Sequence, residues 1–210
     1  MQDGTKISTP RPRGRPRRFE PEEALDRALD AFWTGGYTGT SLDELSAATG
    51  MNRPSLYAAF GDKRRLYLSV LDRFAQMMEA AVSTAMADAP TLADALARFY
   101  GGALTVYLGG EGIARGCFVI CTATVDATEE PLIRDALHAV LRLIDAKLAA
   151  RFRQAVEAGE LPGDTDVDTL AALAAATLHS LAIRARAGTS RGALEALAAA
   201  SIAQLLRPAR

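Results

Sequence analysis

Apolar side chains recur every three or four residues along most of the chain, which is the periodicity of an amphipathic α-helix. The first stripe of this kind consists of Ala24, Leu25, Ala28, Leu29, Phe32 and Trp33. No stretch has the strict alternation that is typical of a half-buried strand. With its glycine and proline breaks, the pattern predicts an all-α protein of nine helices, at about 21–34, 42–49, 53–60, 63–83, 91–108, 117–126, 129–158, 166–187 and 190–206.

The stretch from residue 40 to residue 61 carries start and stop signals for two short helices. Ser41 is followed three residues later by Glu44, which is the pattern of a capping box. Gly50 supplies the positive φ of a tight turn, and Asn52 is a good N-cap for the next helix. Helices this short are not stable alone, so we expect them to pack on their neighbours. Together with the preceding helix, they predict a helix-turn-helix domain.

Composition narrows the class of protein. With 210 residues, 49% of them apolar, the chain can build a substantial core, which excludes wholesale disorder. Two cysteines exclude a disulfide framework, and no run of about eighteen apolar residues is free of charge. The N-terminus lacks the apolar segment of a secretory signal. We therefore expect a cytoplasmic protein without a membrane partner.

The charge is distributed unevenly, although the formal net charge is only −1. Residues 1–18 hold six basic side chains against one acidic, whereas residues 74–210 hold 12 basic and 15 acidic. A basic end on a mildly acidic chain indicates that this end binds a polyanion. We expect a flexible basic arm over 1–18, the helix-turn-helix domain over 19–73 and a second helical domain over 74–210, with a long fourth helix joining the two.

Three cations, Lys63, Arg64 and Arg65, occupy the predicted first turn of this fourth helix. The helix dipole disfavours positive charge at that end. A phosphate at the helix N-terminus would resolve the conflict, because free backbone N–H groups and Lys63 would both contact it. For Lys63 we favour this phosphate contact over simple exposure to solvent. For the two arginines both interpretations stay open.

Fixed residue types at fixed spacing make residues 19–73 similar to a known domain. They resemble the DNA-binding domain of the tetracycline-repressor-like (TetR/AcrR) family of transcriptional regulators. The matching positions are Gly36-Tyr37, Thr40-Ser41, Leu45, Gly50, Ser55-Leu56-Tyr57, Phe60, Asp62-Lys63 and Leu66. The segments GCFV (116–119) and AGELP (158–162) are similar to one subgroup's C-terminal domain, although this second match is weaker.

The resemblance implies a role for individual residues. Base edges would be contacted by Arg53, Pro54 and Ser55. Phosphates would be bound by Thr40, Ser41, Tyr57 and Lys63. The side-chain chemistry agrees, because arginine can bind guanine through two hydrogen bonds and hydroxyl groups can bind phosphate. The resemblance also implies a C-terminal domain that binds an effector and dimerises.

Two features leave the recognised DNA sequence open. Many relatives have a large residue after the tyrosine, whereas this chain has Ala58 and Ala59. Recognition there would rest on methyl contacts or DNA shape. The arm segment Arg13-Gly14-Arg15-Pro16-Arg17 resembles an AT-hook core, in which Arg13 and Arg15 would enter a narrow A·T-rich minor groove. A solvated tail that adds only non-specific attraction is an equal alternative.

An effector pocket is expected among apolar and aromatic residues of the second domain. The candidates are Phe74, Met78, Phe99, Leu104, Tyr107, Phe118 and His179. Most of them would also suit a core, and a satisfied core histidine is the favoured role for His179. Such a pocket would take a small, mainly apolar ligand, with a tyrosine to orient it. Cys117 and Cys121 would share a helical face, and packing is favoured over redox sensing.

The last two predicted helices are rich in alanine and carry apolar stripes. The candidates for a dimer interface are Leu173, Thr177, Leu181, Leu197, Ser201 and Leu205. Small residues let helices approach closely, so two copies would form a four-helix interface. A helix pair inside one protomer is the alternative. Two-fold symmetry would place two reading helices about one DNA turn apart on a near-palindromic site.

The sequence therefore predicts a homodimeric, sequence-specific transcriptional regulator of double-stranded DNA. We expect a repressor that a small, mainly apolar effector releases from its operator. A ligand-independent architectural DNA-binding protein that uses the basic arm is the alternative. No arrangement of nucleophile and base, or of paired carboxylates, indicates an enzyme. No His, Cys and Asp cluster indicates a metal, and no cofactor is expected.

Overall fold

The computed structural model describes residues 20–109 and 114–207, and within these ranges it is all-α and contains no strand. Its elements are α1 (Pro21–Gly39), α2 (Leu42–Thr49), α3 (Arg53–Phe60), α4 (Lys63–Met86), α5 (Leu92–Tyr107), the π-helical turn η1 (Val119–Ala123), α6 (Thr124–Asp126), α7 (Pro131–Glu157), α8 (Val167–Arg186) and α9 (Arg191–Leu205). The all-α prediction is confirmed. The basic arm, with Arg13 and Arg15, lies outside the described residues.

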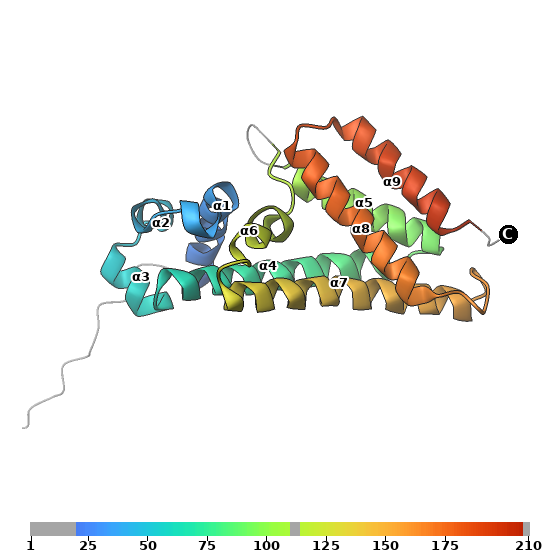
Figure 1. Ribbon diagram of the computed structural model, residues 1–210, viewed down its shortest axis with the longest axis horizontal. Helices are drawn as coiled ribbons and strands as arrows, with labels where there is room; N and C mark the ends of the chain where they lie inside the picture. Colours follow the sequence, from blue (N-terminus) through green and yellow to red (C-terminus); the bar gives the residue numbers. More distant parts are fainter. Residues whose placement is uncertain (1–19, 110–113, 208–210) are drawn as a thin grey trace, which may run out of the picture.

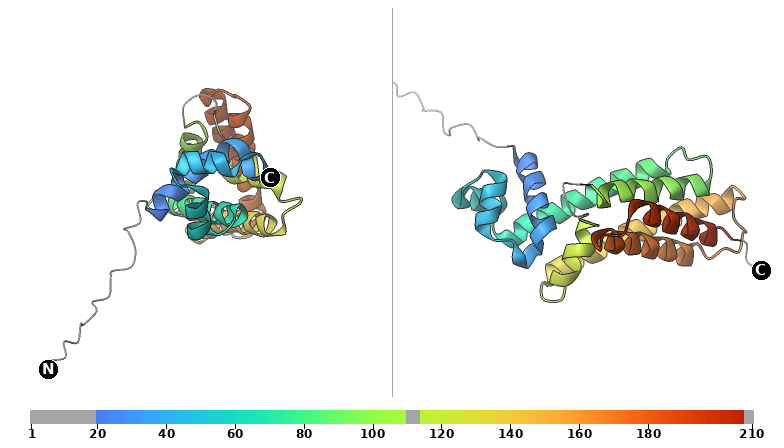
Figure 2. Two further views of the ribbon diagram at one scale, coloured as in Figure 1. Left: turned by 90° about the vertical axis from the view of Figure 1, so that its left-hand side faces the viewer. Right: turned by 90° about the horizontal axis from the view of Figure 1, so that it is seen from above.

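The helices form two parts that share one long helix (Figure 1). The N-terminal head, α1–α3, lies at one end of the molecule, and α4 runs from it along the second part beside α7. Ion pairs between Arg64 and Glu130 and between Lys147 and Glu79 join these two helices, which run in the same direction. Helices α5, α8 and α9 cover α4 and α7 at the end away from the head (Figure 2). The predicted domain division after residue 73 falls inside α4.

The capping residues predicted from the sequence are in place. The Ser41 side chain accepts a hydrogen bond from the Glu44 backbone, and the Glu44 carboxylate accepts one from the Ser41 backbone. Gly50 ends α2 with φ 67°, and the Asn52 side chain caps α3. Asp62 caps α4 by accepting from the backbone N–H of Arg65. These local bonds fix where α2, α3 and α4 begin and where α2 ends.

The first helix breaks where the sequence predicted its end: Gly36 has a non-helical φ of 69°, and a further turn continues from there to Gly39. One element differs from the prediction. The predicted helix over 117–126 is the π-helical turn η1 followed by the three-residue α6. Gly116 precedes this turn with φ 67°, and a Cβ there would lie 2.6 Å from the backbone oxygen of Ala182. This close approach to α8 requires a glycine.

Aromatic side chains join the head to the second part in one continuous core. The ring of Phe118 lies 5.8 Å from that of Trp33, 5.7 Å from that of Tyr67 and 5.5 Å from that of Phe74. Phe118 is fully buried among these rings. Its aromatic contacts are with the core between α1 and α4, and its role as a pocket residue stays a prediction.

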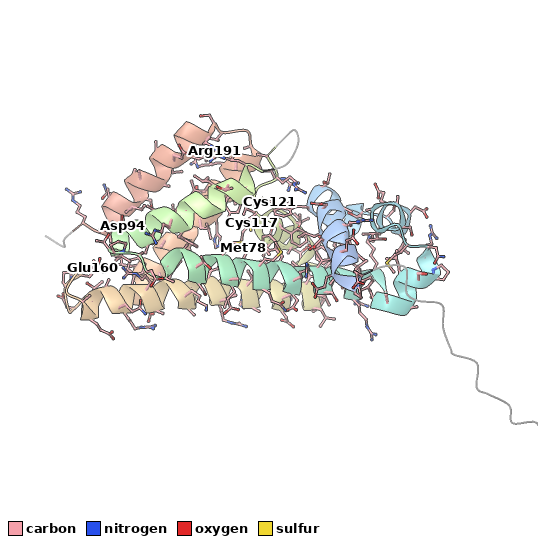
Figure 3. The ribbon with its side chains drawn as sticks, turned by 180° about the vertical axis from the view of Figure 1, so that it is seen from behind. Met78, Asp94, Cys117, Cys121, Glu160 and Arg191 are labelled. Carbon is pink, nitrogen blue, oxygen red and sulfur yellow. The ribbon has the colours of Figure 1, made fainter. Side chains whose placement is uncertain are left out.

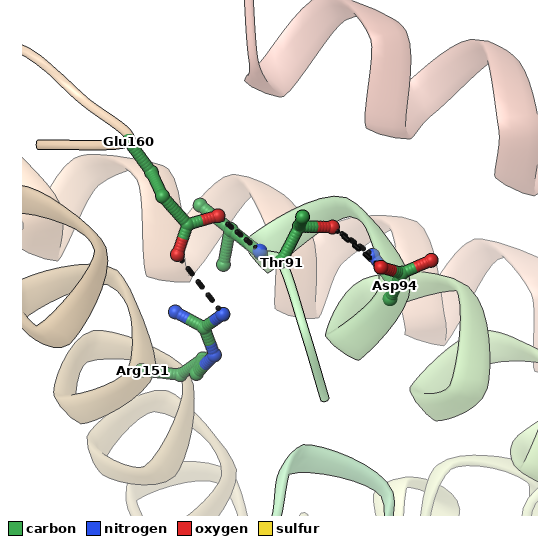
Figure 4. A network of polar contacts seen from close by, with 5 residues as sticks. Thr91, Asp94, Arg151 and Glu160 are labelled. Carbon is green, nitrogen blue, oxygen red and sulfur yellow. Dashed lines mark hydrogen bonds and ion pairs between the residues drawn. The ribbon is translucent and has the colours of Figure 1, made fainter. Parts of the chain in front are cut away.

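At the far end, one carboxylate ties three segments together (Figure 4). Glu160 follows α7 and accepts a hydrogen bond from the backbone N–H of Leu92, the first residue of α5. Its other oxygen lies 3.3 Å from Nη2 of Arg151, whose side chain is only 9% exposed. This arrangement fixes the start of α5 and the end of α7 opposite the head.

None of the described helices meets the length and apolarity that crossing a membrane requires.

Candidate functional site

Helix α3 exposes its first turn at the end of the molecule that is formed by the head (Figure 1). Leu56 is 3% exposed and holds the inner face of α3 against the core of the head. Arg53 and Pro54 are exposed, Ser55 is half-buried, and Tyr57 is 49% exposed. The side chains predicted to meet base edges therefore lie together on the outer face of one anchored helix.

The guanidinium of Arg53 is held by a carboxylate from the neighbouring helix. Its Nε lies 3.0 Å from Oδ1 of Asp43 and its Nη2 lies 2.8 Å from Oδ2. No sequence signal marks Asp43. It lies ten positions before Arg53, a spacing without a helical period, and the pairing depends on the angle at which α2 meets α3.

Three of the predicted phosphate ligands lie within reach of solvent. Ser41 is exposed at the N-terminus of α2, and Tyr57 is exposed on α3. Lys63 is half-buried, with its Nζ 3.4 Å from the backbone oxygen of Thr38 and 4.8 Å from the centre of the Tyr37 ring. Burial lowers the pKa of Lys63, and Asp126 and Glu44 oppose that shift. Lys63 thus already contacts the last turn of α1.

The prediction for Thr40 is corrected. Its side chain is 3% exposed, and its Oγ1 donates to the backbone oxygen of Gly36 at 2.7 Å. A Cβ on Gly35 would lie 2.6 Å from this hydroxyl, so the chain packs tightly around it. The hydroxyl of Thr40 closes the kinked end of α1 and faces the interior instead of the outer surface.

Four of the seven predicted pocket residues line one small cavity in the second part. Phe74, Met78, Tyr107 and His179 surround about 20 Å³ between α4, α7 and α8, together with Cys117. Met78 and Cys117 lie near the middle of the molecule (Figure 3). Tyr107 is fully buried, and its hydroxyl has no hydrogen-bond partner in the described part of the chain. A space this small holds about one water molecule.

The remaining pocket candidates lie elsewhere. Phe99 lines a separate cavity of about 40 Å³, to which Met78 also contributes. Leu104 is 1% exposed and lines neither of these cavities. Its place in the pocket stays a prediction, because Tyr107 and Phe74, which line the cavity, are as deeply buried. A larger groove of about 370 Å³ lies between α4 and α7, and no sequence motif marks it, because it forms in the gap between two helices.

The proposed dimer helices show which candidates face outward. Leu173 on α8 is 52% exposed, whereas Leu181 is fully buried and Leu205 is 8% exposed. The last two side chains pack inside the protomer, so they are corrected from interface to core residues. Ile183, which the sequence analysis did not select, is 57% exposed on α8.

The other three dimer candidates are half-buried between the helices. Thr177 of α8 and Ser201 of α9 share a hydrogen bond of 2.7 Å, and Leu197 packs against the core from α9.

Within the described residues, no group of three or more His, Cys, Asp or Glu side chains is placed to hold a metal ion.

The geometry of the head defines a class of protein. A short helix, a left-handed turn at Gly50 and a second short helix with an exposed first turn form a helix-turn-helix. Arginine, hydroxyl and lysine side chains border that exposed turn, which is the chemistry that meets base edges and phosphates. The head is that of a protein that binds double-stranded DNA.

Two family models match the chain. The model for bacterial regulatory proteins of the tetR family matches residues 24–70, and the model for the tetracyclin repressor-like C-terminal domain matches residues 93–201. The chain therefore belongs to the tetR family of bacterial transcriptional regulators.

Similar proteins agree with this assignment. The HTH-type transcriptional repressor ComR of Escherichia coli (strain K12) is 32% identical over 179 residues, which are 85% of this chain and 85% of ComR. The HTH-type regulator YezE of Bacillus subtilis (strain 168) is 28% identical over 75% of this chain and 81% of its own. Among solved structures, a cysteine mutant of the TetR family regulator CifR, complexed with 26-bp operator DNA, superposes with a TM-score of 0.83. It is 32% identical and covers 90% of this chain and 98% of its own.

Proposed function

We propose that the chain is a homodimeric transcriptional repressor that leaves a near-palindromic operator when a small, mainly apolar and uncharged effector opens the cavity beside α4. One observation carries this proposal. Helix α4 begins next to the reading helix α3, at Lys63, and contributes Phe74 and Met78 to the cavity. A change at the cavity therefore acts on an element that also positions the head.

The DNA-binding part of the proposal has independent support. Arg53 and Tyr57 lie on the exposed face of α3, where the recognition helix of a helix-turn-helix enters the major groove. ComR is named a repressor, and the similar CifR mutant was solved with operator DNA. Both support repression through a specific operator.

The lining of the cavity supports an uncharged effector. Burial raises the pKa of the Cys117 thiol to about 11 and lowers the pKa of His179. Burial also raises the pKa of Tyr107. All three groups are therefore neutral near pH 7, and a charged ligand would lose its hydration without a charged partner. The hydroxyl of Tyr107 is available to orient a polar atom of the effector.

Because the cavity holds only about 20 Å³, an effector has to move the helices that surround it. Three side-chain contacts would carry that movement to the head. Tyr67 of α4 shares a hydrogen bond of 3.0 Å with Thr122 of η1, Asp126 of α6 accepts from Thr38 at 2.7 Å, and Arg115 contacts Asp30 at 2.6 Å. An effector that binds better to the opened form shifts the population toward it, and thereby changes the spacing of the two heads.

The exposed face of α8 supports the dimer. Leu173 and Ile183 project from it, with Ala176 and Ser180 between them at intervals of three and four residues. This spacing is that of an apolar seam between packed helices, and the small residues permit a close approach. Pairing through α8 and α9 would bring together two heads related by a two-fold axis.

The proposal is tested by selecting bound sequences from a randomised duplex pool with the full-length protein at about 150 mM salt. Enrichment of a near-palindrome with two half-sites is expected. Recovery of unenriched or merely A·T-rich DNA would instead favour an architectural role for the basic arm.

A screen with the selected duplex then identifies effectors and tests whether effector binding and DNA binding are coupled. Operator DNA has to weaken effector binding by the same factor by which the effector weakens DNA binding. Equal effector affinity with and without operator would contradict release by effector.

A further inference from the structure

We propose that Asp43 is a positioning residue that aims the guanidinium of Arg53 at a guanine in each half-site and so sets the base preference of the reading helix. This inference rests on the proposed function, because it concerns how the same head reads its operator. It assigns a role to a side chain of α2, which precedes the reading helix.

The geometry of the ion pair determines which donors of Arg53 remain available. Asp43 occupies the side of the guanidinium that carries Nε and Nη2, at 3.0 Å and 2.8 Å. The planar guanidinium has a second pair of parallel donors at its end, formed by Nη1 and the other N–H of Nη2. With its side held by Asp43, Arg53 presents this end pair away from α2.

Guanine is the base whose major-groove edge matches these two parallel donors. Its major-groove edge carries two adjacent acceptors, O6 and N7, which accept both N–H groups of an arginine. Adenine offers one acceptor beside a donor, and thymine offers one acceptor beside a methyl group. Because Arg53 is the first residue of the reading helix, its end pair lies where base edges are contacted.

The exposure of the ion pair between Arg53 and Asp43 indicates that it affects DNA binding more than the stability of the fold. The side chains of Arg53 and Asp43 are 52% and 77% exposed, and ion pairs this exposed contribute little to stability. Docked DNA would exclude water and strengthen the contact between the two side chains. At the same time, a carboxylate on the DNA-facing surface repels phosphates and weakens binding that depends on the backbone alone. Asp43 therefore increases the discrimination between bases and lowers the non-specific affinity for DNA.

The neighbouring residue provides a matched control. Asp43→Asn and Glu44→Gln each remove one negative charge at adjacent positions of α2. Gln at position 44 still completes the capping box with Ser41, and only Asp43 contacts Arg53. A general electrostatic gain in DNA affinity is therefore common to both variants, whereas a change in base preference is specific to Asp43→Asn. Arg53→Ala removes every donor of the side chain, whereas a lysine could still donate to O6 and N7 of guanine.

The experiment selects operators with the full-length wild type and then measures dissociation constants for duplexes in which single base pairs are exchanged in both half-sites. The position read by Arg53 is the one where Arg53→Ala, which removes every donor of the side chain, abolishes the preference. We expect guanine there, favoured by wild type about 5- to 150-fold per half-site. Asp43→Asn should reduce this ratio about three- to tenfold, while Glu44→Gln leaves it unchanged. In the Arg53→Ala background, Asp43→Asn should have no further effect on the ratio.

Several results would overturn the inference. One is a base other than guanine at the position that Arg53 reads. Another is a preference in Asp43→Asn equal to that in Glu44→Gln, even if both variants bind DNA more tightly. A wild type that enriches no half-site would overturn the proposed function as well, and this outcome is distinguishable because it precedes any comparison of variants. Thermal unfolding of Asp43→Asn should match that of wild type, so a lost preference reports on positioning.

Discussion

The carboxylate of Asp126 accepts a hydrogen bond from the hydroxyl of Thr38 at 2.7 Å, which ties α6 to the last turn of α1. Its second oxygen accepts from the backbone N–H of Tyr37 at 3.1 Å. Asp126 is 7% exposed, so its carboxylate is largely buried. The side chain thus connects the DNA-binding head to the second domain directly behind the kink at Gly36.

Replacing this carboxylate should loosen the junction. In Asp126→Ala both hydrogen bonds are lost, and we expect a loss of about 1 to 3 kcal/mol in the free energy of unfolding. The amide proton of Tyr37 should also exchange faster with solvent in hydrogen exchange. Thr38→Val is the matched control, since it removes the hydroxyl and leaves the bond to Tyr37. Protection of Tyr37 that is unchanged in Asp126→Ala would contradict this role.

At the opposite end, Glu160 should contribute strongly to stability. Glu160→Gln removes the charge that compensates the buried guanidinium of Arg151, at a cost of about 1 to 3 kcal/mol. Urea unfolding should therefore show a lower midpoint with an unchanged slope. Glu157→Gln, an exposed position on the last turn of α7, should behave like wild type. Equal midpoints for the two variants would show that the Glu160 contacts do not stabilise the domain.

His179 predicts a pH dependence of stability. Burial lowers its pKa below the usual 6.5, so the unfolded chain binds a proton more tightly than the folded protein. Stability should therefore be complete above about pH 6.5 and fall as the pH drops from there toward the folded pKa. The midpoint of thermal unfolding between pH 5 and pH 8 measures this loss, and His179→Gln should reduce it. His138→Gln, at an exposed position on α7, should retain the dependence of wild type.

The exposed face of α8 predicts how the protein assembles. Ile183→Glu places a charge in the proposed seam between two copies and should convert the dimer into monomers, which light scattering on a sizing column detects. Operator affinity should fall with it, because one head then binds without its partner. Leu132→Glu changes a residue of similar exposure on α7 and should remain dimeric. A variant at Ile183 that stays dimeric would place the interface elsewhere.

Local sequence signals predicted the head well. The capping box of Ser41 and Glu44, the turn at Gly50 and the cap at Asn52 each depend on residues within a few positions, so they could be identified before any tertiary structure. The same holds for the outward placement of Arg53, because its helix has one apolar face.

Features that depend on distant contacts were not predictable in this way. Thr40 is buried because α1 continues past its kink, and that continuation places Tyr37 where Asp126 binds it. Leu181 belongs to a stripe that suits either a dimer seam or a core, and its full burial decides for the core. The pair of Asp43 and Arg53 arises from the angle between two helices, which no spacing along the chain specifies.

The most direct test of the central claim compares two duplexes: the selected operator and a copy with one half-site scrambled. Binding is measured by fluorescence anisotropy at about 150 mM salt. Two linked reading helices predict that scrambling one half-site weakens wild-type binding by at least about tenfold. Arg53→Ala should weaken binding to the intact operator while the protein stays folded. Equal affinity for the two duplexes, or full operator binding by Arg53→Ala, would contradict a dimeric repressor that reads DNA through paired α3 helices.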